Sequence, residues 1–304
     1  MIRGLNDAFP AEVLILILLL LLILTERFTG AGSGVRLRLR GGLGSNGWAR
    51  SGFSLVELLI VIGIIAILLA ILLPVISSVR KAARSASCLA DLHTWGQAFT
   101  MYVSNNGGHS LIDRRDITDP TWYEVLAPYN GDVHGTLVCP SASDPGNIIG
   151  SATQAWGPIH EFSVGRPQWI VRDIFVGSYG INGWLYNIPA DARPGLPDDW
   201  KRHMIELPTN NAQHIPVFGD CIEQWAMPRD TDTPPTNLQN PLPRSDDPGA
   251  GPAPKGMMSY FCIDRHRHAV NLVFLDGHAE NVRLEELWKL QWNNDFTAKD
   301  VAIP

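Results

Sequence analysis

The feature that most constrains this chain is an uncharged apolar run over residues 58–79. A helix crosses a bilayer with about 20 predominantly apolar residues, so the run is long enough to span a membrane. One carboxylate, Glu57, stands directly before it. An ionisable group at the head of such a segment is costly unless a partner neutralises it. Glu57 is therefore either a functional charge or a residue that merely lies in the headgroup layer.

The residues around Glu57 resemble a known processing site. Residues 52–57 read Gly-Phe-Ser-Leu-Val-Glu and lead straight into the apolar run, which is similar to the site of type IV prepilins and of type II secretion pseudopilins. In that family a membrane-embedded aspartyl peptidase cuts after the glycine and methylates the new N-terminal phenylalanine. The resemblance implies cleavage between Gly52 and Phe53. It also places Glu57 at the family's acidic position and Pro74 at its helix-kinking proline.

Elementary electrostatics agrees with this resemblance. After cleavage, Phe53 carries a positive amine about one helical turn from Glu57, and opposite charges attract far more strongly in a low dielectric than in water. A lone buried charge costs several kcal/mol. In the family, the glutamate is thought to meet the amine of a neighbouring subunit and to set the axial stagger of a filament. We therefore expect Glu57 to specify register in assembly, a role well attested for single buried polar groups.

The segment before the cleavage site, residues 1–52, departs from the short basic leaders of the family. It contains an apolar stretch over residues 13–24, which is shorter than a spanning helix and closer to a signal-peptide core. Our preferred hypothesis is a start codon assigned too far upstream, with the true leader in the arginine-rich segment. A second inserted helix is the alternative. Basic residues flank both ends of the run over 58–79, so they bias its orientation only slightly.

Beyond the apolar run, the pattern changes to an amphipathic one. From Ile76 to Tyr102 apolar side chains recur at three- and four-residue steps, which is the period of a helix with one apolar face. The residues at 105–108, Asn-Asn-Gly-Gly, are strong helix breakers. We expect one helix over residues 53–106, its first half in lipid, and an exported globular domain over residues 107–304.

The composition of the domain predicts the fold class. It is rich in Gly, Pro and Trp and low in charge, which suits short strands joined by long loops. We predict an α+β, pilin-like fold with the long N-terminal helix packed on a small antiparallel sheet. Short strands are expected at residues 217–218, 222 and 260–263. The proline-rich segment 226–256 cannot form a central strand or helix and is predicted to be a surface loop.

The C-terminal region predicts a β-hairpin over residues 269–282. Asp276-Gly277 stands between two β-prone runs, and an Asp-Gly pair there is typical of a type I′ turn, which needs positive φ at both central residues. Residues 284–290 read as a short amphipathic helix.

The same region carries a second resemblance. His266, followed after nine residues by Asp276-Gly277, is similar to the H-X9-DG signature at the C-terminus of many prepilin-type proteins of planctomycetes and their relatives. Further pieces fit that family: Cys88-Leu89-Ala90-Asp91-Leu92, Trp122, Leu126-Ala127-Pro128-Tyr129, Cys139-Pro140-Ser141, Ser178-Tyr179-Gly180-Ile181-Asn182 and Pro216-Val217-Phe218-Gly219-Asp220. The resemblance implies an architecture and a location, a single-pass inner-membrane protein with a periplasmic or filament-borne domain. It implies no activity.

Histidines and carboxylates near the hairpin raise the question of a metal site or hydrolase. His266, His268, Asp276 and His278 are competent ligands if they converge. The competing interpretation is structural: Asp276 serves the turn, and His266 bonds a backbone carbonyl or the turn carboxylate. We expect no cofactor and no resident metal, with calcium near Asp276 as the alternative, because pseudopilins often hold calcium in a C-terminal loop. Without a nucleophile-elbow, phosphate-loop or zinc-protease motif, we expect no enzyme.

The four cysteines are Cys88, Cys139, Cys221 and Cys262. None forms a Cys-x-x-Cys pair, which disfavours zinc and thioredoxin-like chemistry. An oxidising compartment would favour disulfides. A Cys88–Cys139 bond, tying the helix to the start of the domain, with Cys221–Cys262 as its complement, is weighed against four buried free thiols.

Two classes of function therefore stay open. The first is a structural pilin or pseudopilin subunit, whose partners are a prepilin peptidase, other subunits, an inner-membrane assembly platform and membrane lipid. The second is a membrane-anchored surface protein that binds a glycan or protein, favoured if Trp156, Trp184, Trp200 and Trp225 share one exposed face. The acidic net charge of −6 and the lack of a basic patch outside the leader argue against nucleic-acid binding by the domain.

Overall fold

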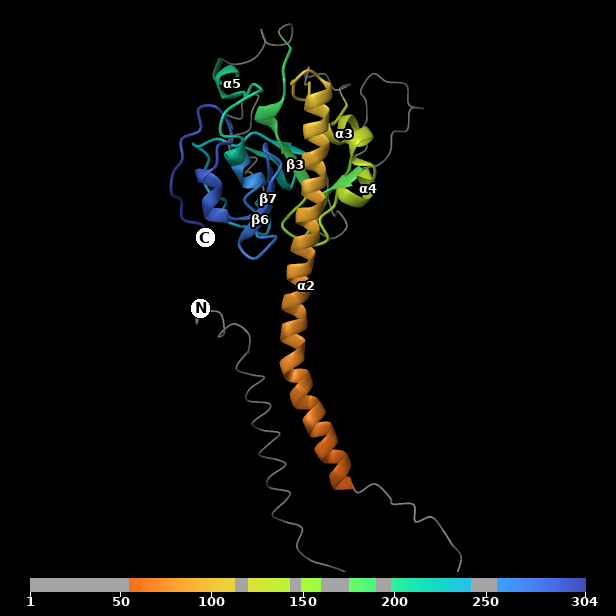
Figure 1. The fold of residues 1–304 in the computed structure, drawn as a ribbon. Helices are drawn as coiled ribbons and strands as arrows, with labels where there is room; N and C mark the ends of the chain where they lie inside the picture. Colours follow the sequence, from red (N-terminus) through yellow and green to blue (C-terminus); the bar gives the residue numbers. More distant parts are fainter. Residues whose placement is uncertain (1–54, 113–119, 143–148, 160–174, 190–197, 242–255) are drawn as a thin grey trace, which may run out of the picture. The chain divides into compact units, whose positions relative to one another are not determined.

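The computed structural model describes residues 55–112, 120–142, 149–159, 175–189, 198–241 and 256–304 (Figure 1). The chain divides into two compact units, Met1–Arg80 and Lys81–Pro304, and the second holds the globular domain. The predicted leader and its cleavage site, residues 1–53, and residues 242–255 of the predicted proline-rich loop lie outside the described residues. The α+β class, with a long helix and a small sheet, is confirmed.

Helix α2 runs over Leu55–Asn105 and contains Pro74. By length and composition, its stretch from Leu58 onward is the one helix among the described residues that could cross a membrane. Its large apolar side chains are exposed as far as Val79. From Cys88 to Phe99 the apolar stripe is buried instead. The helix ends where two glycines, Gly107 and Gly108, take positive φ, a conformation that glycine adopts without strain.

The domain is built on a five-stranded sheet in the order β5-β3-β4-β6-β7. The strands are β3 Tyr179–Asn182, β4 Pro216–Asp220, β5 Trp225–Ala226, β6 Ala269–Phe274 and β7 Ala279–Arg283. The pairs β3–β4, β4–β6 and β6–β7 are antiparallel, and the short edge strand β5 runs parallel to β3. A separate two-stranded sheet pairs β1 Trp156–Ile159 with β2 Phe175–Gly177.

Short helices connect these strands. They are α3 Trp122–Asn130, α4 Val133–Thr136, α5 Asp198–His203 and the 3-10 turns η1 Gly183–Leu185, η3 Ala212–His214, η4 Met257–Tyr260 and η5 Leu284–Lys289. The strand predicted at residues 260–263 is wrong. There the amides of Phe261 and Cys262 both donate to the carbonyl of Met258, so local turns replace the ladder. Residue 222, also predicted as strand, lies just beyond β4, and the predicted helix at 284–290 is the 3-10 turn η5.

The predicted hairpin forms, but its turn differs from the expected one. Gly277 has φ +92°, whereas Asp276 is not among the described residues with positive φ. The amide of Gly277 donates to the carbonyl of Phe274 at 2.9 Å, and Phe274 N donates to His278 O at 2.9 Å. The loop is therefore a type I turn followed by a left-handed glycine, because three residues rather than two separate the closing pair.

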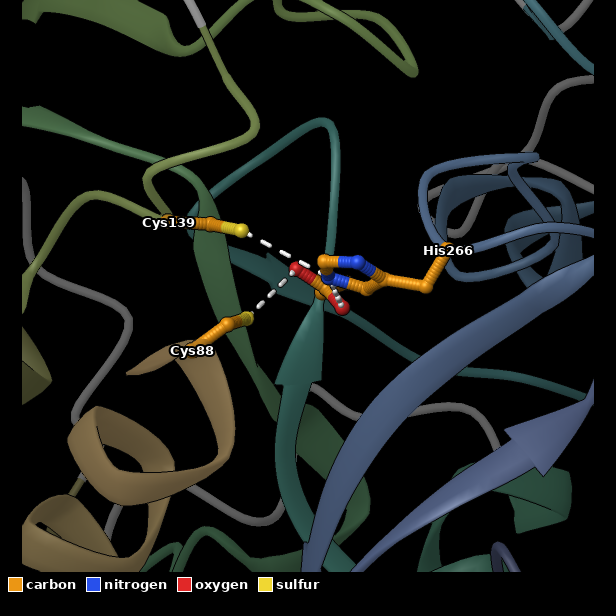
Figure 2. A group of neighbouring side chains, drawn as sticks. Cys88, Cys139 and His266 are labelled. Atoms are coloured by element: carbon orange, nitrogen blue, oxygen red, sulfur yellow. Dashed lines mark hydrogen bonds and ion pairs between the residues drawn. The ribbon is translucent and has the colours of Figure 1, made fainter. Parts of the chain in front are cut away.

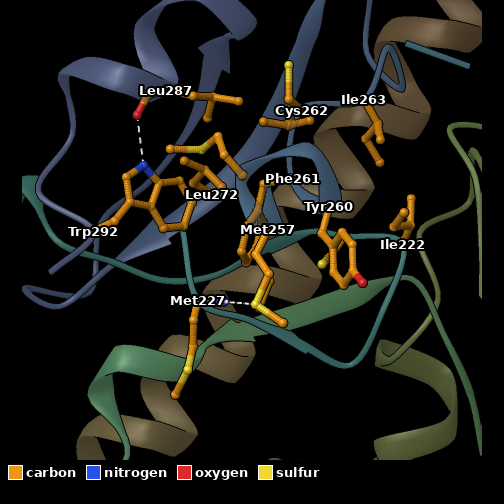
Figure 3. Close-up of a cluster of buried hydrophobic side chains, with 14 of the residues drawn as sticks. Ile222, Met227, Met257, Tyr260, Phe261, Cys262, Ile263, Leu272, Leu287 and Trp292 are labelled. Carbon is orange, nitrogen blue, oxygen red and sulfur yellow. Dashed lines mark hydrogen bonds between the residues drawn. The ribbon is translucent and has the colours of Figure 1, made fainter. Parts of the chain in front are cut away.

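Two hydrophobic cores cover opposite faces of the sheet, since alternate residues of a strand face opposite sides. The helix-side core includes Leu92, Trp95 and Phe99 of α2 together with Val273 of β6. The C-terminal core includes Leu272 and Phe274 of β6, with Phe261, Leu287 and Trp292 packed on them (Figure 3). The approach of α2 to the sheet is close: a Cβ at Gly96 would lie 2.6 Å from Val273 Cγ2.

Buried tryptophans hold the long loops in place. Six indole N–H groups donate to backbone carbonyls: Trp95 to Thr136, Trp122 to Gln224, Trp156 to Tyr179, Trp184 to Pro228, Trp288 to Asp232 and Trp292 to Leu287. Each bond satisfies a donor and an acceptor that burial would otherwise leave costly. These six tryptophans therefore stabilise the interior of the domain and do not form its surface.

Candidate functional site

The predicted processing and assembly residues are Gly52, Phe53 and Glu57. Gly52 and Phe53 lie outside the described residues, and of Glu57 only the backbone, in the first turns of α2, is described. Cleavage, methylation and the register role of Glu57 therefore stay predictions.

The H-X9-DG residues do not form one site. Asp276 Oδ1 lies 2.5 Å from His278 Nδ1 on the partly exposed hairpin turn, and the His278 ring stacks on Phe274 with centroids 4.3 Å apart. His266 is buried and contacts Asp220 rather than Asp276. His268 is exposed beside Asp264. The convergence that a hydrolase would need is therefore not formed by these four residues.

The four tryptophans that would favour a binding protein if they shared one exposed face do not form such a face. Trp156, Trp184 and Trp200 are buried, and Trp225 is half-buried against the cores. The condition that would favour glycan binding is therefore not met by these four residues, because Trp156 and Trp184 donate to backbone carbonyls and Trp184 packs edge-to-face on Trp200.

The described residues instead bring Asp220, Arg265 and His266 together inside the domain. Asp220 closes β4, and its side chain is fully buried. Its Oδ1 accepts from Arg265 Nη1 at 3.1 Å, and its Oδ2 lies 3.1 Å from His266 Nε2. The amide of Asn271 also donates to Oδ2, at 2.8 Å. A buried carboxylate is tolerated when it is paired and hydrogen-bonded in this way.

Arg265 anchors this group to two loops. Beyond Asp220, its guanidinium donates to the carbonyls of Ser151 at 2.8 Å, Ala152 at 3.0 Å and Ser178 at 2.6 Å. The fork of guanidinium donors suits several acceptors held at fixed positions. Arg265 therefore orients Asp220 and joins the residues before β1 and β3 to the segment before β6.

The segment around His266 has an unusual backbone. Arg267 and His268 have φ of 61° and 57°, a left-handed conformation that non-glycine residues rarely adopt. The His266 amide donates to Ala269 O at 3.0 Å, and the His268 amide donates to Asp264 Oδ1 at 2.6 Å. These bonds stabilise the tight turn that places the His266 ring beside Asp220.

Two cysteines complete the cluster. Cys88 of α2 lies with its Sγ 3.4 Å from Asp220 Oδ1, and Cys139, just beyond α4, lies with its Sγ 3.5 Å from His266 Nε2 (Figure 2). All four cysteines are buried free thiols in the structure. The Cys88–Cys139 disulfide stays a prediction, although the structure places both residues in one cluster.

The environment shifts the ionisation of these groups in opposite directions. Burial would raise the pKa of Asp220, but the His266 hydrogen bond and the Arg265 charge lower that pKa to about 2. Burial would lower the pKa of His266, but its bonds to Asp220 and Cys139 raise that pKa to about 9. The hydrogen bond from Cys88 lowers the pKa of Cys139 to about 6, against burial. Burial alone raises the pKa of Cys262 to about 12.

Sequence reasoning named Cys88, Cys139 and His266 but missed their meeting point. Asp220 appeared only as the last residue of a family-like stretch, and Arg265 was not singled out. One sequence feature could have indicated Asp220: it is a charged residue at the end of an apolar strand, Val217-Phe218-Gly219-Asp220. A charge in such a place is buried only when it has a partner.

The fold and the chain's N-terminal pattern together define a class. A 51-residue helix, exposed and apolar at first and then buried in an α+β domain, is a pilin-like arrangement. Residues 49–73 match the model of the prokaryotic N-terminal methylation motif. This match supports a prepilin-type protein, in general a type IV pilin-like or pseudopilin-like one. The searches of curated proteins and of solved structures found no match.

Proposed function

We propose that this protein is a structural subunit of a type II secretion or type IV pilus-like system. It is cleaved after Gly52, methylated at Phe53 and assembled through α2. The observation that carries the proposal is the continuity of the methylation motif over residues 49–73 with α2. The subunit has no catalytic role in this proposal.

The exposure of α2 supports assembly through this helix. Leu68 and Leu73 are 60% and 63% exposed in the single chain, and neighbouring apolar residues are exposed all around the helix. An apolar surface of this extent on a soluble protein marks an interaction site. In our proposal it faces membrane lipid before assembly and the helices of other subunits afterwards.

The partners and the location follow from the same proposal. A prepilin peptidase acts on residues 52–53, and an inner-membrane platform with other subunits receives the mature chain. The protein is a single-pass inner-membrane protein whose domain lies in the periplasm or in a filament. Compatibility with membrane anchoring is supported by the apolar helix and by the motif.

The decisive test is the N-terminus of the mature protein. Mass spectrometry of the membrane-derived chain should find a methylated Phe53 as its first residue. Gly52→Leu should leave the leader attached, whereas the matched control Gly44→Leu, inside the leader, should be processed normally. A mature chain that retains residues 13–24 would overturn both the processing and the start-codon hypothesis.

The alternative function, a membrane-anchored glycan- or protein-binding protein, would be favoured by a shared exposed face of four tryptophans. These residues form no such face, because three of the four tryptophans are buried. An anchored binding protein would also keep its function after α2 residues 55–79 were exchanged for an unrelated spanning helix. A subunit that assembles through α2 would not.

A further inference from the structure

We infer that Cys88, Cys139, Asp220 and His266 form a binding site for a tetrahedral divalent transition-metal ion, with Zn²⁺ as the preferred ion. Each residue offers one ligand atom, these atoms all lie within 4.8 Å of one another, and all four residues are buried. Figure 2 shows the side chains of Cys88, Cys139 and His266 pointing toward one another, and Asp220 contacts both Cys88 and His266. This site goes beyond the proposed function and does not depend on it.

The spacing of the ligand atoms fits a tetrahedral ion. Zinc–ligand bonds of about 2.0–2.3 Å place neighbouring ligand atoms roughly 3.3–3.8 Å apart. The observed contacts are 3.4 Å for Cys88 Sγ to Asp220 Oδ1, 3.5 Å for Cys139 Sγ to His266 Nε2 and 3.1 Å for His266 Nε2 to the other carboxylate oxygen, Asp220 Oδ2. With one ligand atom taken from each residue, all four lie within 4.8 Å of one another. Small side-chain shifts would therefore complete a coordination shell.

The chemistry of the ligands selects the class of ion. Two sulfurs, one imidazole nitrogen and one carboxylate oxygen suit a borderline-soft ion such as Zn²⁺. Calcium, which takes six or more oxygen ligands, does not fit this set. The site is thus distinct in place and in chemistry from a calcium loop at Asp276.

The surrounding protein holds the ligands in position. Arg265 and the Asn271 amide hold Asp220, and the Ser178 hydroxyl accepts the Cys139 amide hydrogen at 2.6 Å. Such outer contacts orient ligands and strengthen metal affinity. The four ligands come from α2, the segment after α4, the end of β4 and the turn before β6, so an ion would join four separate parts of the domain.

Charge balance is compatible with the bound state. Two thiolates and a carboxylate carry three negative charges, which a divalent ion and the buried Arg265 guanidinium balance. Binding would displace the protons carried by the two sulfurs and by His266 Nε2, and would leave no net charge in the interior. The uptake of metal would therefore release protons, as it does at other thiolate sites.

The route to the site affects how it must be tested. A cavity of about 500 Å³ borders His266 and Arg265 and is also lined by Lys81, Arg84 and Arg267. These basic side chains outnumber the one carboxylate of the lining, Asp264, and so oppose the approach of a cation to the folded domain. Metal should therefore be supplied during synthesis of the protein rather than added afterwards.

The test uses the full chain, purified in detergent from cells supplied with Zn²⁺ or Co²⁺. We expect about one ion per chain, and for Co²⁺ the intense near-ultraviolet absorption of thiolate-to-metal charge transfer. Cys88→Ser and Cys139→Ser should each weaken affinity more than tenfold and remove intensity from this band. Cys262→Ser, which removes a buried thiol outside the cluster, is the matched control and should change neither.

Three results would overturn the site. One is wild-type protein that contains no stoichiometric metal and shows no charge-transfer band, a readout that needs no variant to fold. Another is metal content equal in Cys88→Ser and wild type. The third is a Cys88–Cys139 disulfide in protein isolated without reductant, detected by mass spectrometry of linked peptides. None of these results bears on cleavage at Gly52, so the two proposals fail separately.

Discussion

The first half of helix α2 is apolar on every side, whereas the second half mixes apolar with polar and charged residues, and the two halves differ in what covers their apolar side chains. Before Val79 the large apolar side chains are exposed on every side of the helix, whereas from Cys88 to Phe99 they form one buried stripe on the sheet. A helix that is apolar all round needs an apolar solvent or partner, and a striped helix needs only a core on one face. The arrangement of the apolar residues, together with their number, therefore tells the two environments apart.

The largest effect on the domain is expected from Trp95→Ala. Trp95 is fully buried between α3 and the sheet, and its indole donates to Thr136 O at 2.8 Å. The loss of its packing should lower the free energy of unfolding by about 3–5 kcal/mol. The matched control in the exposed half, Leu73→Ala, should change domain unfolding by less than about 0.5 kcal/mol. Denaturant titration in detergent measures both, and equal effects would contradict the comparison.

A smaller loss is expected where α2 and β6 meet most closely. Gly96→Val would place a Cβ 2.6 Å from Val273 Cγ2, and the overpacking should cost about 1–3 kcal/mol. Gln97→Val, one residue further on the exposed side of the helix, should cost only a few tenths of a kcal/mol. The double variant Gly96→Val with Val273→Ala should recover part of the loss. Without such recovery, the close approach is not the cause.

The hairpin turn provides a third test, away from α2. Gly277→Val puts a β-branched residue at φ +92° and should cost about 1–3 kcal/mol. Asp276→Asn should be nearly silent, within about 0.5 kcal/mol, because the side chain is partly exposed. Thermal melts with and without chelator separate this from a metal role. A chelator effect that Asp276→Asn abolishes would place an ion at the turn instead of at the buried cluster.

The smallest effect on domain stability is expected from Glu57→Val. The residue precedes the apolar run, far along the chain from the buried stripe, so unfolding of the domain should be unchanged. Peptidase cleavage should also proceed, because in the proposed processing the scissile bond is defined mainly by Gly52. Assembly should nevertheless fail, because the proposed partner of the Phe53 amine is lost. Normal incorporation into filaments, or wild-type secretion, would exclude a register role.

The parts of the fold set by local sequence were predictable, and the long-range parts were not. The helical period from Ile76 to Tyr102 and the breakers after it marked the end of α2, and β-prone runs marked the hairpin. The predicted type I′ turn was wrong because an Asp-Gly pair does not reveal how many residues the loop contains. That number depends on the pairing register of the two strands, in which Val273 lies opposite Ala279. Residues 260–263 were predicted as a strand because they are apolar. Their apolar side chains do not reveal the local backbone hydrogen bonds that hold them in turns.

Three members of the candidate site, Cys88, Cys139 and His266, were singled out from the sequence, but Asp220, Arg265 and the assembly of the site were not. Cys88 and Asp220 are 132 residues apart in sequence, and Cys139 and His266 are 127 apart. Contacts at such separations depend on how the sheet and helix pack, which periodicity does not encode. The spacing between His266 and Asp276 suggested a shared role. However, His266 precedes β6 and Asp276 follows it, so the two residues lie beyond opposite ends of this strand.

The buried tryptophans also provide intrinsic fluorescence probes of the domain. Indoles buried in apolar surroundings emit at shorter wavelengths than indoles in water. The helix side of the sheet contains Trp95, Trp122 and Trp156. The opposite side contains Trp184, Trp288 and Trp292. Intrinsic fluorescence can thus follow both faces during unfolding without any added dye. Replacing the tryptophans of one face with phenylalanine would show whether the two faces lose their structure together or in sequence.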